Sequence, residues 1–216
     1  MLADLLFPKA CVVCGAPKTL LCRNCIAQVP PWNDLVCPYC LFPNDAGLCL
    51  SCQKKTYVHD ILIATDYDTP VVKKALHAYK YDGIRALAIP LAHFLLPHAE
   101  NLTALPFVSV PMHPRRKKQR GFDHLALLLD HLSQHVPIDR WQGLERVKYH
   151  KPLMGKTAEE RKKEIHGAFR VVSKPPPRIV LVDDVMSSGA TLEECAKMLT
   201  FAGCDAVTAL VLARKQ

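Results

Sequence analysis

Residues 179–194 contain the side chains with the clearest chemical potential in the chain. Four aliphatic residues, 179–182, lead into the adjacent acids Asp183 and Asp184, and a run of small residues follows. A short apolar run of this kind predicts a strand buried on both faces of a parallel sheet. The carboxylates can accept hydrogen bonds from a sugar diol, and the small residues allow backbone N–H groups to approach a phosphate. The combination predicts a ribose phosphate site.

The residues around this loop are predicted to place it at one edge of a sheet. Apolar residues recur downstream at helical spacing, and Gly203 follows them as a helix C-cap. These apolar residues are Leu192, Cys195, Ala196, Leu199 and Ala202. The order is therefore strand, loop and helix, and in open α/β sheets ligands bind beyond the carboxyl ends of the strands. The plainer alternative is a turn that begins at Asp183 and Asp184, with Thr191 near the start of the helix.

A second polar group follows residues 107–110, another apolar run that predicts a buried strand. Its members are His113, Arg115, Arg116, Lys117, Lys118, Arg120 and Gly121. We expect these residues to form a loop at the same sheet edge as Asp183, because both groups follow parallel strands. Arginine suits pyrophosphate, since its planar guanidinium forms paired hydrogen bonds with phosphate oxygens. A basic turn on the surface is the plainer alternative.

The balance of charge indicates an anionic partner. The formal net charge is +8, and residues 140–174 contain ten Lys or Arg against four acids. Such clusters attract pyrophosphate, nucleotides or nucleic acid, although a solvated basic surface is the plainer interpretation. No stretch approaches the ~20 apolar residues that cross a bilayer, and the first residues lack the basic start of a signal peptide. We therefore expect a cytoplasmic protein without membrane insertion.

Most of the cysteines are arranged as metal ligands. Eight of the ten form four C-x-x-C pairs, namely Cys11 and Cys14, Cys22 and Cys25, Cys37 and Cys40, and Cys49 and Cys52. Paired thiolates at this spacing predict tetrahedral zinc in a reducing compartment. We favour two structural Zn²⁺ ions with consecutive pairs sharing one ion, and a cross-braced arrangement is the alternative. Of the other two, Cys204 and Cys195, the latter is predicted to fill the core.

The rest of the chain alternates between strand and helix patterns. Strands are predicted over residues 61–67, 107–110, 179–182 and 206–212, and helices over residues 71–79, 84–96, 122–135 and 192–202. Pro90 predicts a bend or a restart in the second helix. The alternation predicts an α/β fold with a parallel sheet. We therefore divide the chain into a double zinc-ribbon domain, residues 1–56, and an α/β domain, residues 57–216.

The string IVLVDDVMSSGATLEE, residues 179–194, resembles the phosphoribosyl-pyrophosphate (PRPP) motif of type I phosphoribosyltransferases. The whole chain resembles the ComF family of competence-associated, phosphoribosyltransferase-like proteins. That resemblance is carried by the tandem C-x-x-C module that opens with LLFPKACVVCG, and by YKYDG at residues 79–83. It is also carried by VPMHPRRKKQRGFDHLALL at residues 110–128 and RKKEIHGAF at residues 161–169. It implies a type I phosphoribosyltransferase-like parallel sheet behind a small zinc-ribbon module.

The resemblance implies roles for the residues singled out above. Asp183 and Asp184 would be the catalytic acids that hold the ribose hydroxyls, with Mg²⁺ accompanying PRPP, and we expect both carboxylates to be accessible to solvent. The PRPP-binding residues would be Asp183, Asp184, Val185, Met186, Ser187, Ser188, Gly189, Ala190 and Thr191. The basic loop of residues 113–121 would hold pyrophosphate or DNA.

Residues 146–161 resemble the mobile hood that covers the site in this family, and here the sequence departs from the family pattern. Thr and Gln recur where His150 and Leu153 stand, and an Asn often stands at the position of Glu164. The side chain of Leu153 forms no hydrogen bonds, so any substrate contact made by the family's Gln is absent.

The function implied by the resemblance is that of a PRPP-binding, phosphoribosyltransferase-like protein in natural competence. It would handle incoming single-stranded DNA in the cytoplasm, together with other competence proteins. Phosphoribosyl transfer passes through a cationic sugar while pyrophosphate leaves, and the two loops supply phosphate-binding groups for such a step. His113 and Tyr81 are candidate acid–base groups. The alternatives are a PRPP sensor and a nucleic-acid-binding protein without turnover, and the sequence specifies neither the acceptor nor the oligomeric state.

Overall fold

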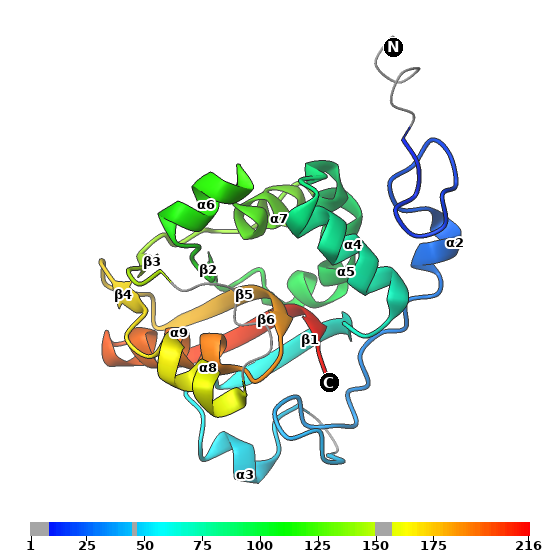
Figure 1. The fold of residues 1–216 in the computed structure, drawn as a ribbon. Coiled ribbons are helices and arrows are strands. Elements are labelled where there is room, and N and C mark those ends of the chain that lie inside the picture. Colours follow the sequence, from blue (N-terminus) through cyan, green and yellow to red (C-terminus); the bar gives the residue numbers. More distant parts are fainter. Residues whose placement is uncertain (1–8, 45–46, 150–156) are drawn as a thin grey trace.

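A four-stranded parallel sheet lies at the centre of the computed structural model, which describes residues 9–44, 47–149 and 157–216 (Figure 1). Its strands are β1 (Asp60–Asp66), β2 (Phe107–Ser109), β5 (Arg178–Met186) and β6 (Ala206–Arg214). The spatial order is β1-β6-β5-β2, and each neighbouring pair is parallel. β5 and β6 are apolar runs that are buried almost throughout, as is typical of a parallel sheet covered on both faces.

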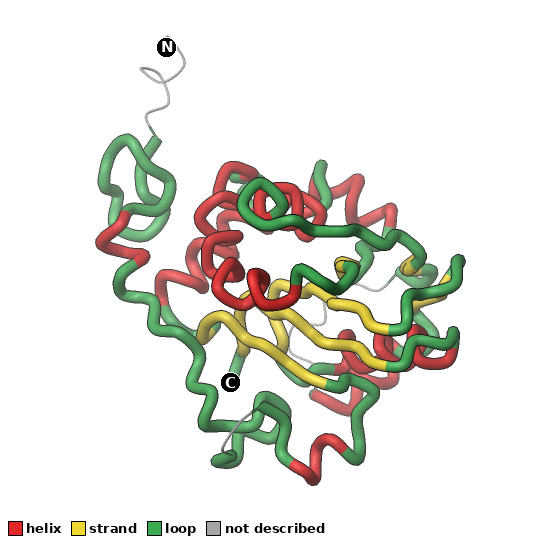
Figure 2. Tube along the Cα trace, turned by 180° about the vertical axis from the view of Figure 1, so that it is seen from behind, coloured by secondary structure: helices red, strands yellow, loops and turns green. Residues whose placement is uncertain are grey.

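Helices cover both faces of the sheet, and the predicted α/β class is confirmed. One face carries α4 (Pro70–Tyr81), α5 (Ala88–Ala99) and α7 (His124–Leu132), and the other carries α8 (Ala158–Ile165) and α9 (Ala190–Phe201). Figure 2 shows the same layers from behind. Within the described residues, no helix combines the length and the apolar character that spanning a membrane requires.

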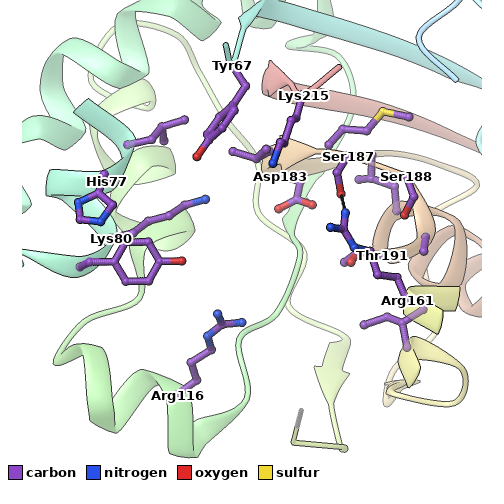
Figure 3. A pocket seen from close by; sticks show the side chains of 18 residues that line it. Tyr67, His77, Lys80, Arg116, Arg161, Asp183, Ser187, Ser188, Thr191 and Lys215 are labelled. Carbon is purple, nitrogen blue, oxygen red and sulfur yellow. Dashed lines mark hydrogen bonds between the residues drawn. The ribbon is translucent and has the colours of Figure 1, made fainter. Parts of the chain in front are cut away.

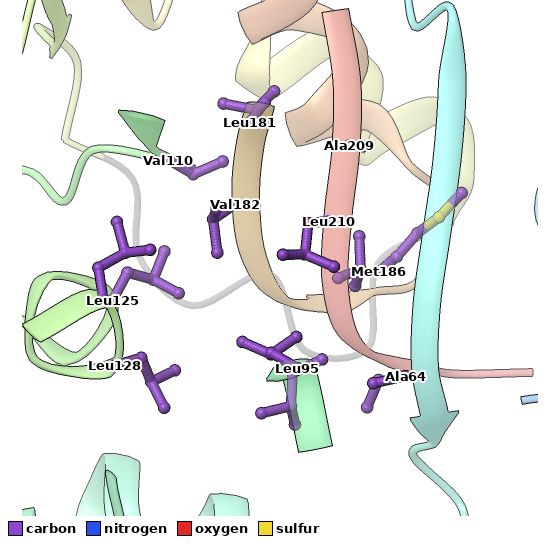
Figure 4. Packing of buried hydrophobic residues seen from close by; sticks show 14 of the residues in the cluster. Ala64, Leu95, Val110, Leu125, Leu128, Leu181, Val182, Met186, Ala209 and Leu210 are labelled. Atoms are coloured by element: carbon purple, nitrogen blue, oxygen red, sulfur yellow. The ribbon is translucent and has the colours of Figure 1, made fainter. Parts of the chain in front are cut away.

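Buried hydrophobic residues cover both faces of the sheet, and a large part of the core lies between the sheet and the helices of the first face. Leu95 of α5 and Leu128 of α7 point toward Val182 and Leu210 of the sheet (Figure 4). All four side chains are fully buried. Burial of an aliphatic side chain of this size stabilises the fold by about 1.5–3 kcal/mol relative to leaving it exposed. This packing gives the carboxyl edge of the sheet a rigid base.

The smaller elements lie around this core. A hairpin is formed by β3 (Leu144–Arg146) and β4 (Phe169–Val171), which pair antiparallel. The remaining elements are α2 (Arg23–Ile26), α3 (Leu50–Gln53), the 3-10 turns Arg85–Leu87 and Glu100–Leu102, and α6 (Pro114–Arg120).

The predicted basic loop is wrong in its secondary structure, because most of it forms α6. Pro114 stands at the first helical position, where its fixed φ is favourable and its missing N–H is not needed. The side chain of His113 caps this end by accepting a hydrogen bond from the Arg115 N–H. Gly121 ends the helix in the left-handed conformation, with φ of 80°. Lys and Arg between these caps are good helix formers.

Two further boundaries differ from the prediction. β5 does not end at residue 182 but continues to Met186, because Asp183 and Val185 still pair with β6. The acids therefore lie within the strand and not after it. α5 begins at Ala88, so Pro90 falls in its first turn, where no intrahelical N–H is needed, and the restart occurs before the proline.

The eight paired cysteines form two clusters at the N-terminal end. Cys11, Cys14, Cys22 and Cys25 make the first cluster, in ribbon 1 (residues 9–29), and Cys37, Cys40, Cys49 and Cys52 make the second, in ribbon 2 (residues 36–56). Within each cluster the four Sγ atoms lie within 4.8 Å of one another. Consecutive pairs therefore share one site, and the cross-braced alternative is wrong.

The spacing within the clusters fits a tetrahedral metal. Cys14 and Cys22 Sγ atoms are 3.6 Å apart, and Cys40 and Cys49 Sγ atoms are 3.7 Å apart. Zinc bonds to sulfur of about 2.3 Å at tetrahedral angles place sulfur atoms about 3.8 Å apart. None of the described cysteines forms a disulfide. The donor set thus fits one structural Zn²⁺ in each ribbon.

We predict that the purified protein contains one zinc ion for each of the two cysteine clusters. Chelation should unfold the ribbons, since each is too small to be stabilised by a core of its own. Elemental analysis, together with amide hydrogen exchange before and after chelation, checks this expectation. Absence of zinc from protein purified without chelators, or unchanged exchange in both ribbons after its removal, would contradict it.

Candidate active site

The short loop between β5 and α9 lies at the carboxyl edge of the sheet. It consists of Ser187, Ser188 and Gly189, and Gly189 is the N-cap of α9 with φ of 74°. A side chain at this φ is strained, and a Cβ atom here would also lie 2.6 Å from Cε1 of Tyr39. Arg161 of α8 reaches the loop and donates a hydrogen bond of 2.6 Å from Nη1 to Ser187 Oγ (Figure 3). We refer to residues 187–191 as the phosphate loop, after the ligand that the sequence predicts for it.

Asp184 is held by two other elements. Lys80 Nζ at the end of α4 lies 2.8 Å from Asp184 Oδ2, and Nε2 of His124 in α7 donates a hydrogen bond to the same oxygen. Burial alone would raise the pKa of Asp184, but Lys80 and His124 lower it well below its usual range. The carboxylate is therefore ionised and already has its partners within the protein.

The expectation that both carboxylates are accessible to solvent is wrong. Asp183 is 9% exposed and Asp184 is 6% exposed, because β5 continues past them under the covering helices. Replacing Asp184 by alanine would leave the charge of Lys80, whose side chain is 15% exposed, without its partner, which is costly. Replacing both Asp183 and Asp184 by alanine is therefore expected to disturb the fold as well as the site.

Asp183 differs from its neighbour in having no cationic side chain bonded to it among the described residues. Its Oδ1 accepts a hydrogen bond of 2.9 Å from the Asp184 N–H. Burial and the adjacent negative charge of Asp184 raise the pKa of Asp183 to about 7. A carboxyl group with this pKa can change its protonation state near neutral pH, and it can act as a ligand when ionised.

Two clefts meet at Asp183. The larger, about 370 Å³, is lined by the phosphate loop, Tyr67, Arg161 and Lys215, and Figure 3 shows these side chains around it. The smaller, about 170 Å³, is cationic, and among its lining residues are Arg116, Arg120, His124, Arg146 and Asp184. Both clefts are also lined by Lys80, Tyr81, Arg116 and Asp183. The loop of residues 187–191 therefore lies on one side of Asp183 and a cationic cleft on the other.

The predicted basic residues divide between the two sides of α6. Arg116 and Arg120, four positions apart, are partly buried and line the cationic cleft. Arg115, Lys117 and Lys118 are exposed. The guanidinium of Arg115 lies 4.6 Å from the ring centroid of Tyr149, and Lys117 Nζ lies 3.8 Å from Asp123 Oδ2. His113 and Gly121 cap the helix. Because the segment is helical, some of its basic side chains line the cationic cleft and the others are exposed to solvent.

Several residues of the site were not identified from the sequence as site residues. Lys80 and His124 complete the buried contact with Asp184, and Arg146 of β3 lines the cationic cleft. Lys80 lies within the YKYDG segment, which contributes to the family resemblance but was not assigned a function from the sequence. Arg146 begins the predicted hood and His124 lies in the segment 110–128, but neither was assigned a role, because only the fold brings them to Asp183.

The candidate acid–base groups have different surroundings. Tyr81 is exposed at the mouth of both clefts, whereas His113 caps α6 and its ring packs at 5.3 Å from that of Tyr149. His150 and Leu153 of the predicted hood lie outside the described residues. Arg146 and Arg161, at the two ends of that segment, both line the clefts.

We predict that Asp183→Asn changes how stability depends on pH. Because the folded-state pKa of Asp183 is raised from 3.8 to about 7, the folded state is favoured at acidic pH, and that contribution is lost as pH rises from 3.8 to about 7. The variant has no carboxyl here and does not undergo this loss. Between pH 5 and pH 8, the free energy of unfolding of the variant should therefore rise relative to that of the parent by on the order of a few kcal/mol. Urea unfolding across this range measures the difference.

The exposed carboxyl of Asp205 supplies the control for this experiment. Asp205→Asn should follow the parent at each pH. If Asp183→Asn runs parallel to the parent as well, Asp183 is not a buried group with a raised pKa.

Comparison with known proteins gives relatives that match along nearly the whole chain, although no family model matches it. The chain is 30% identical to the DNA utilization protein YhgH of Escherichia coli K12, over 94% of this chain and 83% of that protein. It is 27% identical to competence protein F of Haemophilus influenzae, over 89% and 78% of the two chains. It is 25% identical to competence protein ComFC of Streptococcus pneumoniae, over 90% and 87%. With identity at this level over almost its full length, the chain belongs to the ComF family.

Proposed function

We propose that this protein binds PRPP, or a nucleoside 5′-phosphate, across the two clefts that meet at Asp183. The observation that carries the proposal is the position of this carboxyl between a phosphate loop and a cationic cleft. PRPP has the matching order of groups, with a 5′-phosphate at one end, a sugar diol in the middle and a pyrophosphate at the other end.

The phosphate loop would bind the 5′-phosphate. The N-terminus of α9 offers backbone N–H groups and a favourable dipole, and the hydroxyls of Ser187, Ser188 and Thr191 surround it. Arg161 adds a positive charge beside Ser187, and its Nε atom is buried without a hydrogen-bond partner in the described structure. A ligand phosphate would supply the missing acceptor for Arg161.

The cationic cleft would bind the pyrophosphate. Arg116, Arg120 and Arg146 line it, and Lys80 retains two N–H donors beyond the one directed at Asp184. Nη1 of Arg120 is buried and has no hydrogen-bond partner among the described residues. Buried donors are normally paired, so this orphaned group supports an absent anionic ligand.

The donor set is compatible with Mg²⁺ bound together with PRPP. Mg²⁺ is usually held by one or two carboxylates and by phosphate oxygens of the substrate. Of the two acids, Asp183 would hold the ion, because Asp184 is already engaged by Lys80 and His124. The ion would neutralise part of the pyrophosphate charge.

The arrangement also supports phosphoribosyl transfer. In this reaction the bond from C1 of the ribose to the pyrophosphate oxygen breaks, and a bond from C1 to an acceptor forms. The arginines of the cationic cleft would stabilise the departing pyrophosphate, and the phosphate loop would fix the sugar. A PRPP sensor that binds the same molecule without turnover is the alternative.

We further propose a role in natural competence that includes handling of single-stranded DNA in the cytoplasm. The names of the relatives, DNA utilization protein and competence protein, support this role. So does the outward side of α6, since Arg115, Lys117 and Lys118 are exposed and do not line either cleft. A strand could bind there without displacing PRPP, and other competence proteins are expected partners.

The proposal for PRPP is tested by comparing Arg120→Gln with Arg115→Gln, two changes of the same kind on opposite sides of α6. Loss of the inward charge should weaken PRPP and pyrophosphate by about tenfold or more, since a hydrogen bond to a charged group contributes ~1.5–3 kcal/mol. The outward variant should bind like the parent. Calorimetry with Mg²⁺ present measures both, and equal affinities for the two variants would contradict the proposed cleft.

Turnover is tested separately, by incubating the parent with PRPP and a panel of bases, nucleotides and single-stranded DNA. Release of pyrophosphate that depends on one acceptor would establish the transferase. Binding without PRPP consumption across the panel would favour the sensor.

For single-stranded DNA, we predict that neutralising Arg115, Lys117 and Lys118 together, each to Gln, weakens binding at every salt concentration. The slope of log affinity against log salt should also become shallower, by about 0.7 for each phosphate that the protein no longer neutralises. Arg120→Gln is the matched control and should keep the parent slope. An unchanged slope in the triple variant would place the DNA elsewhere on the protein.

A further inference from the structure

Ribbon 2 lies against the part of the α/β domain that contains the phosphate loop. In Figure 1, α3 of this ribbon lies on the side of the sheet that carries α8 and α9, whereas α2 of ribbon 1 lies at the periphery near α4. A cavity of about 350 Å³ is lined both by ribbon 2, at Tyr39, Cys52 and Thr56, and by the phosphate loop, at Ser188 and Gly189. The loop therefore separates this cavity from the larger of the two clefts.

Tyr39 contacts the phosphate loop on the side that faces ribbon 2. Its ring packs closely against Gly189. A Cβ atom at this position would lie only 2.6 Å from Tyr39 Cε1 and 3.3 Å from Cδ1, so the ring leaves no room for a side chain. Gly189 has φ of 74° and is the N-cap of α9. The aromatic ring thus contacts the backbone at the left-handed residue that joins the loop to α9.

Glu193, in the first turn of α9, makes the second connection. Its carboxylate accepts hydrogen bonds from the hydroxyls of Tyr39 and Thr56 and from the Tyr57 N–H, at 3.0 Å for the last. Charged hydrogen bonds of this kind are stronger than neutral ones. The helix that begins at the phosphate loop is thereby attached to ribbon 2 and to the segment after it.

Arg214, at the end of β6, makes the third connection. Its buried guanidinium donates from Nε to the Pro38 carbonyl at 2.6 Å and from Nη1 to the Met186 carbonyl at 3.3 Å. Met186 is the last residue of β5 before the loop. Ribbon 2 is therefore tied to the residue before the loop, to Gly189 within it, and to the helix after it.

Two of the ribbon residues in these contacts lie between ligands of one cluster. Pro38 and Tyr39 stand between Cys37 and Cys40, so the metal that these cysteines would share sets the position of both. Ribbon 1 has different neighbours, since it meets the α/β domain at α4, where Lys74 Nζ donates to the Val13 carbonyl at 3.4 Å. The two clusters thus have the same ligands but different surroundings.

We propose that the second cysteine cluster, acting through Tyr39, is a positioning element for the phosphate loop, and that the first cluster is not. Metal in the second cluster keeps Tyr39 against Gly189, and the loop then presents its N–H groups in the geometry that a phosphate requires. The part concerning ligand affinity rests on the proposed function above, whereas the part concerning the order of the loop does not.

A pair of matched variants tests this, because Cys14 and Cys40 are the exposed second cysteines of their C-x-x-C pairs. Cys14→Ser and Cys40→Ser should each lose one zinc ion. Only Cys40→Ser should increase hydrogen exchange at the amides of residues 187–191 and weaken PRPP by about tenfold or more, because misplacing binding groups is costly. Exchange that rises equally in both variants, or in neither, would overturn the proposal.

Tyr39→Ala provides a second test that leaves all eight cysteines in place. It should retain the zinc content of the parent and reproduce the increased exchange at residues 187–191. Parent-like exchange in this variant would show that Tyr39 does not position the loop. If the parent itself does not bind PRPP, the proposed function fails, but the exchange measurements without ligand still decide whether ribbon 2 orders the loop.

Discussion

The buried contact of Asp184 with Lys80 and His124 is the constraint on which the site depends. It joins β5, α4 and α7. The Tyr79 hydroxyl of α4 also holds α7 by donating a hydrogen bond of 2.6 Å to the His124 carbonyl. Removing charges from water is unfavourable, so such a contact persists only where the partners are fixed together. Its consequence is an asymmetry between adjacent acids, since Asp184 is used to hold the fold while Asp183 remains available to a ligand.

This asymmetry gives the charges around the clefts a consistent explanation. The protein has a formal net charge of +8, yet the inward side chains of α6 and the arginines at 146 and 161 are grouped around a single carboxyl. A cluster of partly buried cations repels itself, and it is stabilised when an anion binds. The exposed cations of α6 lie on a different surface, so under the proposed function one helix would take part in binding both a small phosphate ligand and a strand of DNA.

The sequence predicted those parts of the molecule that depend on local patterns. The strand before Asp183, the helix after Gly189 and the pairing of the eight cysteines all follow from spacing, which is a property of neighbouring residues. The burial of the acids, the contact of Lys80 with Asp184 and the packing of Tyr39 on Gly189 join residues far apart in the chain. The sequence predicts a loop where α6 forms, because the run of charged residues lacks the apolar periodicity of a helix. The signals for a helix here are the capping residues His113 and Gly121 at its two ends.

We propose that Asp183 lies where the sugar of a ribose phosphate binds, and a crystal structure of the protein with PRPP and Mg²⁺ would decide this. We expect the 5′-phosphate against residues 187–191, the sugar hydroxyls at Asp183, and the pyrophosphate among Arg116, Arg120 and Arg146. Asp184 should keep its contact with Lys80. A pyrophosphate on the outward side of α6, or a sugar bound away from Asp183, would show that the two clefts do not form the PRPP site.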